Sequence, residues 1–180
     1  LARLAAERGV RTVQGQCVEH TGEGEPYLPF VEALGQLGHG PARDAVRAVL
    51  ARYAPMWLAH LPGLVSASEL ERLQGRLQGA TPARMLRELA EALEVLTADQ
   101  LLVLVLEDLQ WSDRATVEAL AYLAQRPAPA RLLVLGTYRP VDVLLQGHPL
   151  RGLVQELCGR GQGSDLRLEF LAVADVATYL

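Results

Sequence analysis

The sequence predicts an α/β fold in which a parallel β-sheet is flanked by helices. Short apolar runs alternate along the chain with longer segments whose apolar residues recur at helical spacing. Residues 101–106 (LLVLVL) and 131–136 (RLLVLG) are almost wholly apolar, which is typical of strands buried on both faces of a parallel sheet. The chain has 180 residues, of which 50% are hydrophobic and 21% charged, as expected for one ordinary globular domain.

The first half of the chain predicts one strand within a largely helical region. Gly9 indicates a helix end, because glycine readily adopts the left-handed conformation of a C-cap. The β-branched residues after it favour a strand, whereas prolines and glycines interrupt residues 54–80. The elements predicted here are a helix ending at Gly9, a strand over residues 10–17, and helices over 27–37, 41–53 and 68–77.

The second half predicts the strand–helix alternation of a parallel sheet. Thr81 and Pro82 start a helix, because threonine is a favoured N-cap and proline a favoured first residue. The elements predicted here are helices over 82–96, 113–126, 150–157 and 174–180, and strands over 101–106, 131–136 and 166–170. Residues 26–100 are therefore an all-helical insert between the first two strands.

The basic residues exclude several chemistries. All 17 are arginine, so the chain contains neither a Schiff-base lysine nor the lysine of a phosphate-binding loop. The net charge of −4 argues against direct contact with nucleic acid. No apolar segment is long enough to span a membrane and no signal peptide is evident, so we expect a cytoplasmic location and no membrane partner. Two cysteines without a metal-ligand spacing predict buried or half-buried free thiols.

Charged and polar residues follow the two apolar runs. Glu107 and Asp108 come after the first run, and Thr137 and Arg139 after the second. Ligands of open α/β sheets bind at the carboxyl ends of strands, and Mg²⁺ commonly bridges phosphates to one or two carboxylates. A second carboxylate can position a water for attack on a phosphoryl group, and an arginine can neutralise the terminal phosphate. An alternative is a solvated loop in which Ser112 or Asp113 caps the next helix.

These residues carry a resemblance to a known family. LLVLVLEDLQWSD (101–113) resembles the Walker B segment of AAA+-related P-loop ATPases of the STAND, or signal-transduction, type. LLVLGTYRP (132–140) resembles the sensor 1 strand of that group, and HPL (148–150) with the following helix is also similar. PYLPFVEAL (26–34) resembles the segment after its second strand, and LRLEFL (166–171) resembles its last core strand.

The resemblance implies a three-layer P-loop NTPase-like fold. Residues 1–180 would be a partial ATPase core, with the helical insert (26–100), the Walker B and sensor 1 region (101–140), and the last core helix and strand (141–180). The Walker A strand would lie centrally, between the sensor 1 strand and the last strand, but the chain holds no GxxxxGK[ST] loop. Both ends of the sequence fall within helical patterns, so we expect a fragment of a longer protein, unable to hydrolyse ATP alone.

The resemblance also implies roles for individual residues. Glu107 and Asp108 would hold Mg²⁺ and activate the attacking water, although Glu107 stands where the group commonly has aspartate. Arg139 would contact the γ-phosphate of ATP, with Thr137 as a supporting hydroxyl. Asp113 would cap the next helix or position the residues that contact the nucleotide.

The function implied is an ATP-binding switch of a bacterial signalling or transcriptional regulator that hydrolyses ATP slowly. Its partners would be ATP or ADP with Mg²⁺, other domains of the same polypeptide, and other copies on ATP binding. Two alternatives remain open from sequence: a degenerate scaffold that senses nucleotide or binds a protein without turnover, and an unrelated Mg²⁺-dependent hydrolase.

Overall fold

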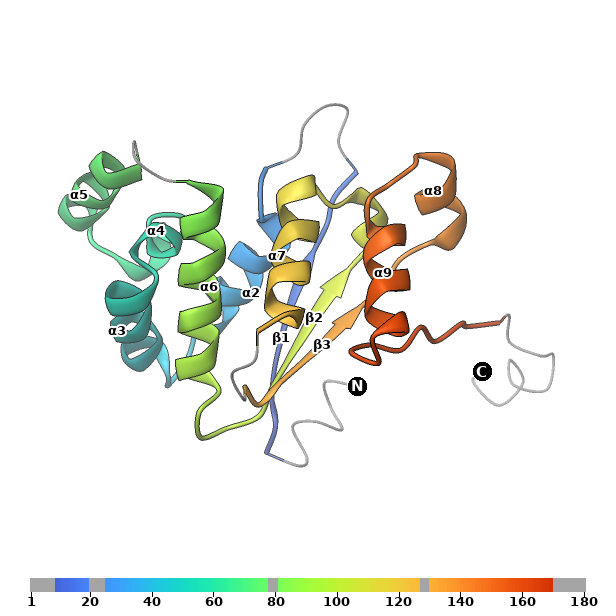
Figure 1. Cartoon of the computed structure of the whole chain (residues 1–180). Coiled ribbons are helices and arrows are strands. Elements are labelled where there is room, and N and C mark those ends of the chain that lie inside the picture. Colours follow the sequence, from blue (N-terminus) through green and yellow to red (C-terminus); the bar gives the residue numbers. More distant parts are fainter. Residues whose placement is uncertain (1–8, 20–24, 78–80, 127–129, 170–180) are drawn as a thin grey trace, which may run out of the picture.

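A computed structural model describes residues 9–19, 25–77, 81–126 and 130–169, and the sheet at its centre has three parallel strands (Figure 1). The strands are β1 (Arg11–Gln16), β2 (Leu102–Glu107) and β3 (Leu132–Gly136), in the order β1-β2-β3. Gln16 pairs with Glu107, and Leu106 pairs with Gly136, so the three carboxyl ends lie at one edge of the sheet. The α/β class predicted from the apolar runs is confirmed.

Helices make both crossover connections between the strands, as parallel pairing requires. Within its described residues, the segment between β1 and β2 forms helices and no strand, as predicted: α2 (Leu28–Leu37), α3 (Arg43–Tyr53), α4 (Pro55–Leu58), η1 (Pro62–Leu64), α5 (Ala67–Leu77) and α6 (Pro82–Leu96). Beyond β2 come η2 (Leu109–Trp111), α7 (Arg114–Ala124), α8 (Pro140–Leu145) and α9 (Leu150–Gly159). Figure 1 shows α6, α7 and α9 side by side across the sheet.

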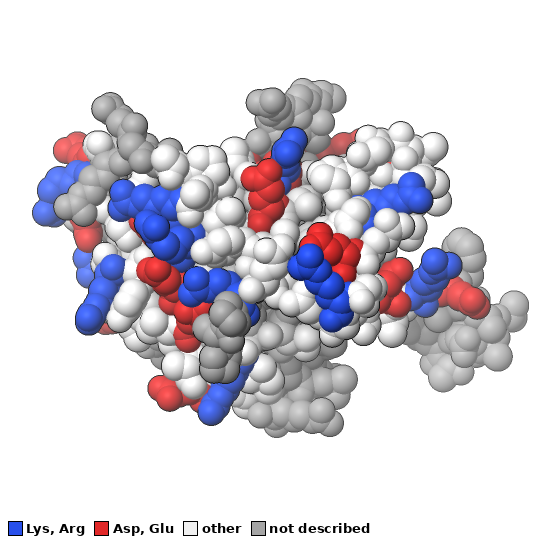
Figure 2. Space-filling view, in the orientation of Figure 1, with Lys and Arg blue, Asp and Glu red and all other residues white. Residues whose placement is uncertain are grey.

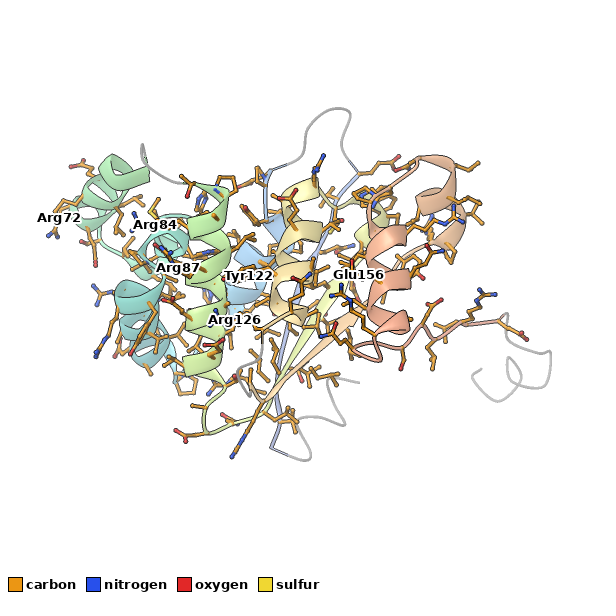
Figure 3. All side chains as sticks on the ribbon, viewed as in Figure 1. Arg72, Arg84, Arg87, Tyr122, Arg126 and Glu156 are labelled. Atoms are coloured by element: carbon orange, nitrogen blue, oxygen red, sulfur yellow. The ribbon has the colours of Figure 1, made fainter. Side chains whose placement is uncertain are left out.

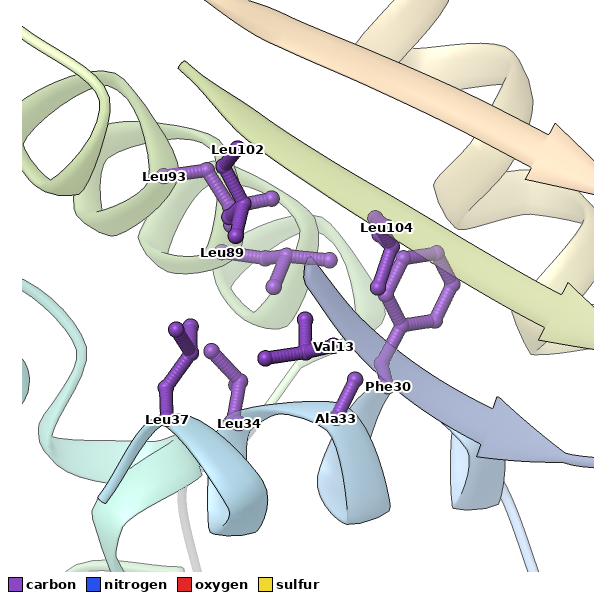
Figure 4. A pocket seen from close by; sticks show the side chains of 9 residues that line it. All are labelled: Val13, Phe30, Ala33, Leu34, Leu37, Leu89, Leu93, Leu102 and Leu104. Atoms are coloured by element: carbon purple, nitrogen blue, oxygen red, sulfur yellow. The ribbon is translucent and has the colours of Figure 1, made fainter. Parts of the chain in front are cut away.

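The core joins α2 and α6 to the first two strands. Figure 4 shows nine apolar side chains from these elements around a small gap. Because its lining offers almost no polar partner, this gap is expected to be dry. Trp57 of α4 is fully buried beside Phe30 and Tyr27, and its indole N–H donates to the carbonyl of Met85 at 2.8 Å. Tyr27 and Phe30 thus belong to the core.

Helix α2 also closes the outer edge of β1. The backbone N–H groups of Gln14 and Gln16 donate to Gln36 Oε1 at 2.9 Å and to Glu32 Oε2 at 2.8 Å, both on α2. Gly15 allows this close approach, because a Cβ there would lie 1.8 Å from the carbonyl oxygen of Pro29. Side chains thereby satisfy edge groups that would otherwise attract another strand.

The outer surface carries mixed charge. Figure 2 shows acidic and basic side chains interspersed on one face, and many of them form pairs four residues apart on a helix. Arg126 instead joins two elements: it pairs with Glu94 of α6 at 2.7 Å and lies over the ring of Tyr122 (Figure 3). None of the described helices is long and apolar enough to span a membrane.

The structure corrects two expectations from the sequence and adds one helix that was not predicted. Residues 166–169 form no strand, and Leu166 and Leu168 are 80% and 87% exposed, because no described strand lies beside them to supply hydrogen bonds. Cys158 is exposed, since it lies on the outer side of α9, whereas Cys17 is buried. Helix α8 was not expected: Pro140 begins it directly after the end of β3. The predicted helices at 1–9 and 174–180 fall outside the described residues, except Gly9, whose φ of 68° suits a C-cap.

Candidate functional site

The predicted site residues of two strands meet at the carboxyl edge of the sheet. Glu107 is the last residue of β2, and Asp108 follows it in the left-handed conformation, with φ 57° and ψ 42°. The backbone N–H of Asp108 donates to Thr137 Oγ1 at 3.1 Å, and that of Leu109 donates to the carbonyl of Thr137 at 2.8 Å. The turn after β2 is therefore bonded directly to the end of β3.

Glutamine amides hold both carboxylates from the side of β1. Gln14 Nε2 donates to Glu107 Oε2 at 2.8 Å, and Gln16 Nε2 donates to Asp108 Oδ2 at 3.2 Å. These glutamines were not assigned to the site from sequence. Their signal was the alternation of polar residues along a short strand, but only the register with β2 shows which carboxylates they meet.

A third glutamine lies beneath the turn. Gln110 has no exposed surface; its Nε2 donates to Asp108 Oδ1 at 3.0 Å, and its Oε1 accepts the backbone N–H of Arg139 at 3.0 Å. Arg139 itself is exposed, and its guanidinium carbon lies 5.6 Å from the ring centre of Trp111. Trp111 is half-buried and packs against the core.

Asp113 is the N-cap of α7, as predicted. Its Oδ1 accepts the backbone N–H of Thr116 at 2.9 Å, and its Oδ2 accepts the hydroxyl of Thr116 and the backbone N–H of Tyr27. This carboxylate is thus engaged in joining α7 to the start of α2. A nucleotide contact by Asp113 stays a prediction.

His148 ties the segment after α8 to the same turn. The backbone N–H of Leu150 donates to His148 Nδ1 at 3.3 Å, so Nε2 carries the ring proton and donates to the carbonyl of Ser112 at 2.8 Å. Ser112 is buried, and its hydroxyl donates to the carbonyl of Leu109 at 2.8 Å. Ser112 is therefore structural, since its hydroxyl has no histidine partner among the described contacts.

The thiol nearest the acidic residues is inert. Burial, and to a lesser extent the negative charges of Asp113, Asp108 and Glu32, together raise the pKa of Cys17 from 9.0 to about 12. A thiol with so high a pKa is no nucleophile near neutral pH.

The acidic pair suits Mg²⁺ when phosphate completes the ligand set. Among the described residues, no group of three or more histidine, cysteine or acidic side chains could hold a metal ion by itself. Mg²⁺ does not need one, because it keeps several waters and is commonly bound by one or two carboxylates and the phosphates of its substrate. Glu107 and Asp108 accept two or fewer amide hydrogen bonds each, which leaves lone pairs free on both carboxylates.

Comparison with known families places the chain. The family model described as AAA ATPase domain matches residues 1–135, which include β1, the helical segment, β2 and α7. The match ends before Thr137 and Arg139. Searches of curated proteins and of solved structures found no match. Because the matched residues make up most of the sequence and the fold is a helix-flanked parallel sheet, the chain belongs to the AAA ATPase domain family, whose function is of the nucleotide-binding ATPase type.

Proposed function

We propose that the chain is the core of an ATP-driven switch of the STAND type, within a multidomain signalling or transcriptional regulator. The observation that carries this proposal is the bond between the backbone N–H of Asp108 and Thr137 Oγ1 at 3.1 Å. This bond joins the turn at residues 107–111, which we name the acidic turn, to the end of β3. A phosphate bound at the acidic turn would therefore affect the position of the end of β3, and the reverse. Slow hydrolysis of ATP would then reset the switch.

Each residue at the edge has a role in this mechanism. Glu107 would hold Mg²⁺ directly or through water, and Asp108 would accept a proton from the attacking water. Bound Mg²⁺ would neutralise charge on the phosphates. Because Thr137 Oγ1 accepts the N–H of Asp108, its own hydroxyl proton is free to be donated to a phosphate oxygen. Arg139, exposed and without an ion pair among the described residues, is available to the γ-phosphate.

The phosphate-binding loop must come from outside residues 1–180, because the sequence contains no lysine. We place its strand on the outer edge of β3, beside which no described strand lies. The proposal further includes a cytoplasmic location, contacts with other domains of the same polypeptide, self-association on ATP binding, and no direct contact of this segment with nucleic acid.

The test uses the intact protein expressed from its full coding sequence. Sequencing upstream of Leu1 should find a GxxxxGK[ST] loop. Mg²⁺-dependent phosphate release from ATP should fall by about 100-fold or more in Asp108→Asn, while ATP affinity is retained, because the general base is lost and binding is not. Asp99→Asn is the matched control, since Asp99 is exposed at the opposite end of β2.

The other outcomes separate the alternatives. A protein that binds ATP, releases no phosphate and signals unchanged in Asp108→Asn is a non-hydrolysing scaffold. Phosphatase activity from residues 1–180 alone indicates an unrelated Mg²⁺-dependent hydrolase. Phosphate release unaffected by Asp108→Asn rules out the role given to this carboxylate.

A further inference from the structure

Gln110 is the fully buried polar side chain of the acidic turn. It has no exposed surface, yet both ends of its amide are hydrogen-bonded, one to a carboxylate and the other to the backbone of a neighbouring segment. An apolar side chain of equal volume would fill the same space without the free-energy cost of burying an amide. The two partners therefore indicate a specific task.

The orientation of the amide is set by its partners. The carboxylate of Asp108 can only accept, and the backbone N–H of Arg139 can only donate. Nε2 must therefore face Asp108 Oδ1, at 3.0 Å, and Oε1 must face the N–H of Arg139, at 3.0 Å. In the reversed orientation, Oε1 would face the carboxylate of Asp108, which also only accepts, and Nε2 would face the N–H of Arg139, which also only donates. One rigid amide thus joins the acidic residue to Arg139 with a unique polarity.

Thr137 and Gln110 connect different parts of the two segments. The bonds of Thr137 to the backbone N–H groups of Asp108 and Leu109 hold the main chains of the two segments together. Among the residues that the structure describes, only Gln110 links the side chain of Asp108 to the main chain at Arg139, where α8 begins. Trp111, the next residue, lies under the guanidinium of Arg139 at 5.6 Å. Residues 110 and 111 thus contact both the backbone and the side chain of Arg139.

We propose that Gln110 is a positioning residue that couples the carboxylate of Asp108 to the start of α8 at Arg139. When the Asp108 carboxylate gains or loses a ligand, its bond to Nε2 changes, and the amide passes the change to the Arg139 N–H. The meaning of the coupling as a sensor of bound phosphate rests on the proposed function. The two hydrogen bonds on which the coupling depends lie within the described residues.

The first experiment measures amide hydrogen exchange by NMR on the 180-residue chain. Gln110→Met, which keeps the volume and removes both bonds, should speed exchange of the Arg139 amide by about tenfold, as loss of one buried hydrogen bond implies. The Thr137 amide, which donates to the carbonyl of Leu106 at 2.9 Å, should change little and serves as the internal reference. Gln155→Met on the exposed face of α9 is the matched control.

A second pair of variants tests coupling without disturbing the core. Asp108→Gly removes the carboxylate and tolerates a φ of 57°, whereas Asp108→Asn keeps an oxygen that can accept from Gln110. The proposal expects faster exchange at Arg139 in the glycine variant and near-normal exchange in the asparagine variant. In the Gln110→Met background, Asp108→Gly should add no further effect. Glu107→Ala should leave exchange of the Arg139 amide unchanged, because the carboxylate of Glu107 accepts from Gln14 and not from Gln110.

The outcomes distinguish this inference from the proposed function. Unchanged exchange at Arg139 in both Gln110→Met and Asp108→Gly, or additive effects in the double variant, would overturn the coupling whatever the intact protein does. Coupling by NMR in a protein that never releases phosphate would instead overturn the hydrolysis. In an active intact protein, Gln110→Met should lower kcat with KM unchanged, because it alters the arrangement of the site and no contact with nucleotide.

Discussion

Oδ2 of Asp113 accepts the backbone N–H of Tyr27 at 3.1 Å, although the two residues lie 86 positions apart. The same carboxylate caps α7 through the N–H of Thr116. Tyr27 is the N-cap of α2 and has the left-handed conformation, with φ 63°. A single acidic side chain therefore fixes the starts of two helices on either side of the acidic turn.

Loss of this carboxylate should destabilise the chain more than loss of an ordinary cap. Asp113→Ala removes an N-cap and leaves the N–H of Tyr27 without its acceptor, so the free energy of unfolding should fall by about 2–4 kcal/mol. Urea unfolding followed by circular dichroism measures it. Asp44→Ala is the control, because Asp44 lies in the first turn of α3 without capping it. A loss no larger than that of the control would show that the bond to Tyr27 contributes nothing.

Gly15 should tolerate no side chain. Its Cβ in Gly15→Ala would lie 1.8 Å from the carbonyl oxygen of Pro29, so β1 and α2 must separate. Because Glu32 and Gln36 cap β1 across the same contact, we expect a loss of about 3 kcal/mol or more, or failure to fold.

The same substitution of glycine by alanine, made where the new Cβ has space, should raise the free energy of unfolding. In Gly152→Ala, the new Cβ on α9 meets nothing within 4 Å, and the helix gains about 0.5–1 kcal/mol from the better helix former. Thermal unfolding of both variants tests the pair. Equal effects of the two substitutions would mean that the contact of Gly15 with Pro29 does not constrain the fold.

The fold was largely predictable because its signals are local. Continuous apolar runs identified β2 and β3, and the Thr81–Pro82 and Asp113 caps marked the starts of α6 and α7. The expected strand at 166–170 failed for a non-local reason. Its alternating pattern suits a strand, but a strand forms only where another strand accepts its hydrogen bonds, and no described strand lies beside it.

The position of the candidate site's charged residues was predictable, whereas their polar partners were not. Glu107, Asp108, Thr137 and Arg139 follow buried strands, which places them at the edge where the carboxyl ends meet. The amides of the three glutamines gave no such signal, because glutamine is common on solvent-exposed surfaces. Only the register of β1 with β2 and the turn after β2 bring their donors to the carboxylates.

Cys17 should make the chain less stable in alkali. Burial and neighbouring carboxylates raise its pKa from 9.0 to about 12, so the folded state holds the thiol proton more tightly than the unfolded state. Its stabilising contribution is complete below pH 9 and is lost as the pH rises from 9 towards 12. The free energy of unfolding should fall through this range by up to about 1.4 kcal/mol per pH unit from this group.

Comparison of two alanine variants isolates that contribution. Cys17→Ala should show a shallower alkaline decline than the unsubstituted chain in urea unfolding at successive pH values. Cys158→Ala should decline like the unsubstituted chain, because Cys158 is exposed. In the native chain, a thiol reagent at pH 8 should modify Cys158 and spare Cys17. Parallel pH profiles for the two variants would contradict the assignment.

Trp111 should report the state of Arg139 in the intact protein. The guanidinium lies 5.6 Å from the Trp111 ring centre, and a move towards the γ-phosphate of ATP would end this cation–π contact. ATP should therefore change the tryptophan fluorescence, whereas ADP, which has no γ-phosphate, should not. The change should come from Trp111, because Trp57 is fully buried and bonded to Met85. Trp111→Phe should abolish the change, and Arg139→Ala should remove the difference between the nucleotides without preventing ADP binding. An ATP-specific signal that survives in Trp111→Phe would place the sensing movement elsewhere in the protein.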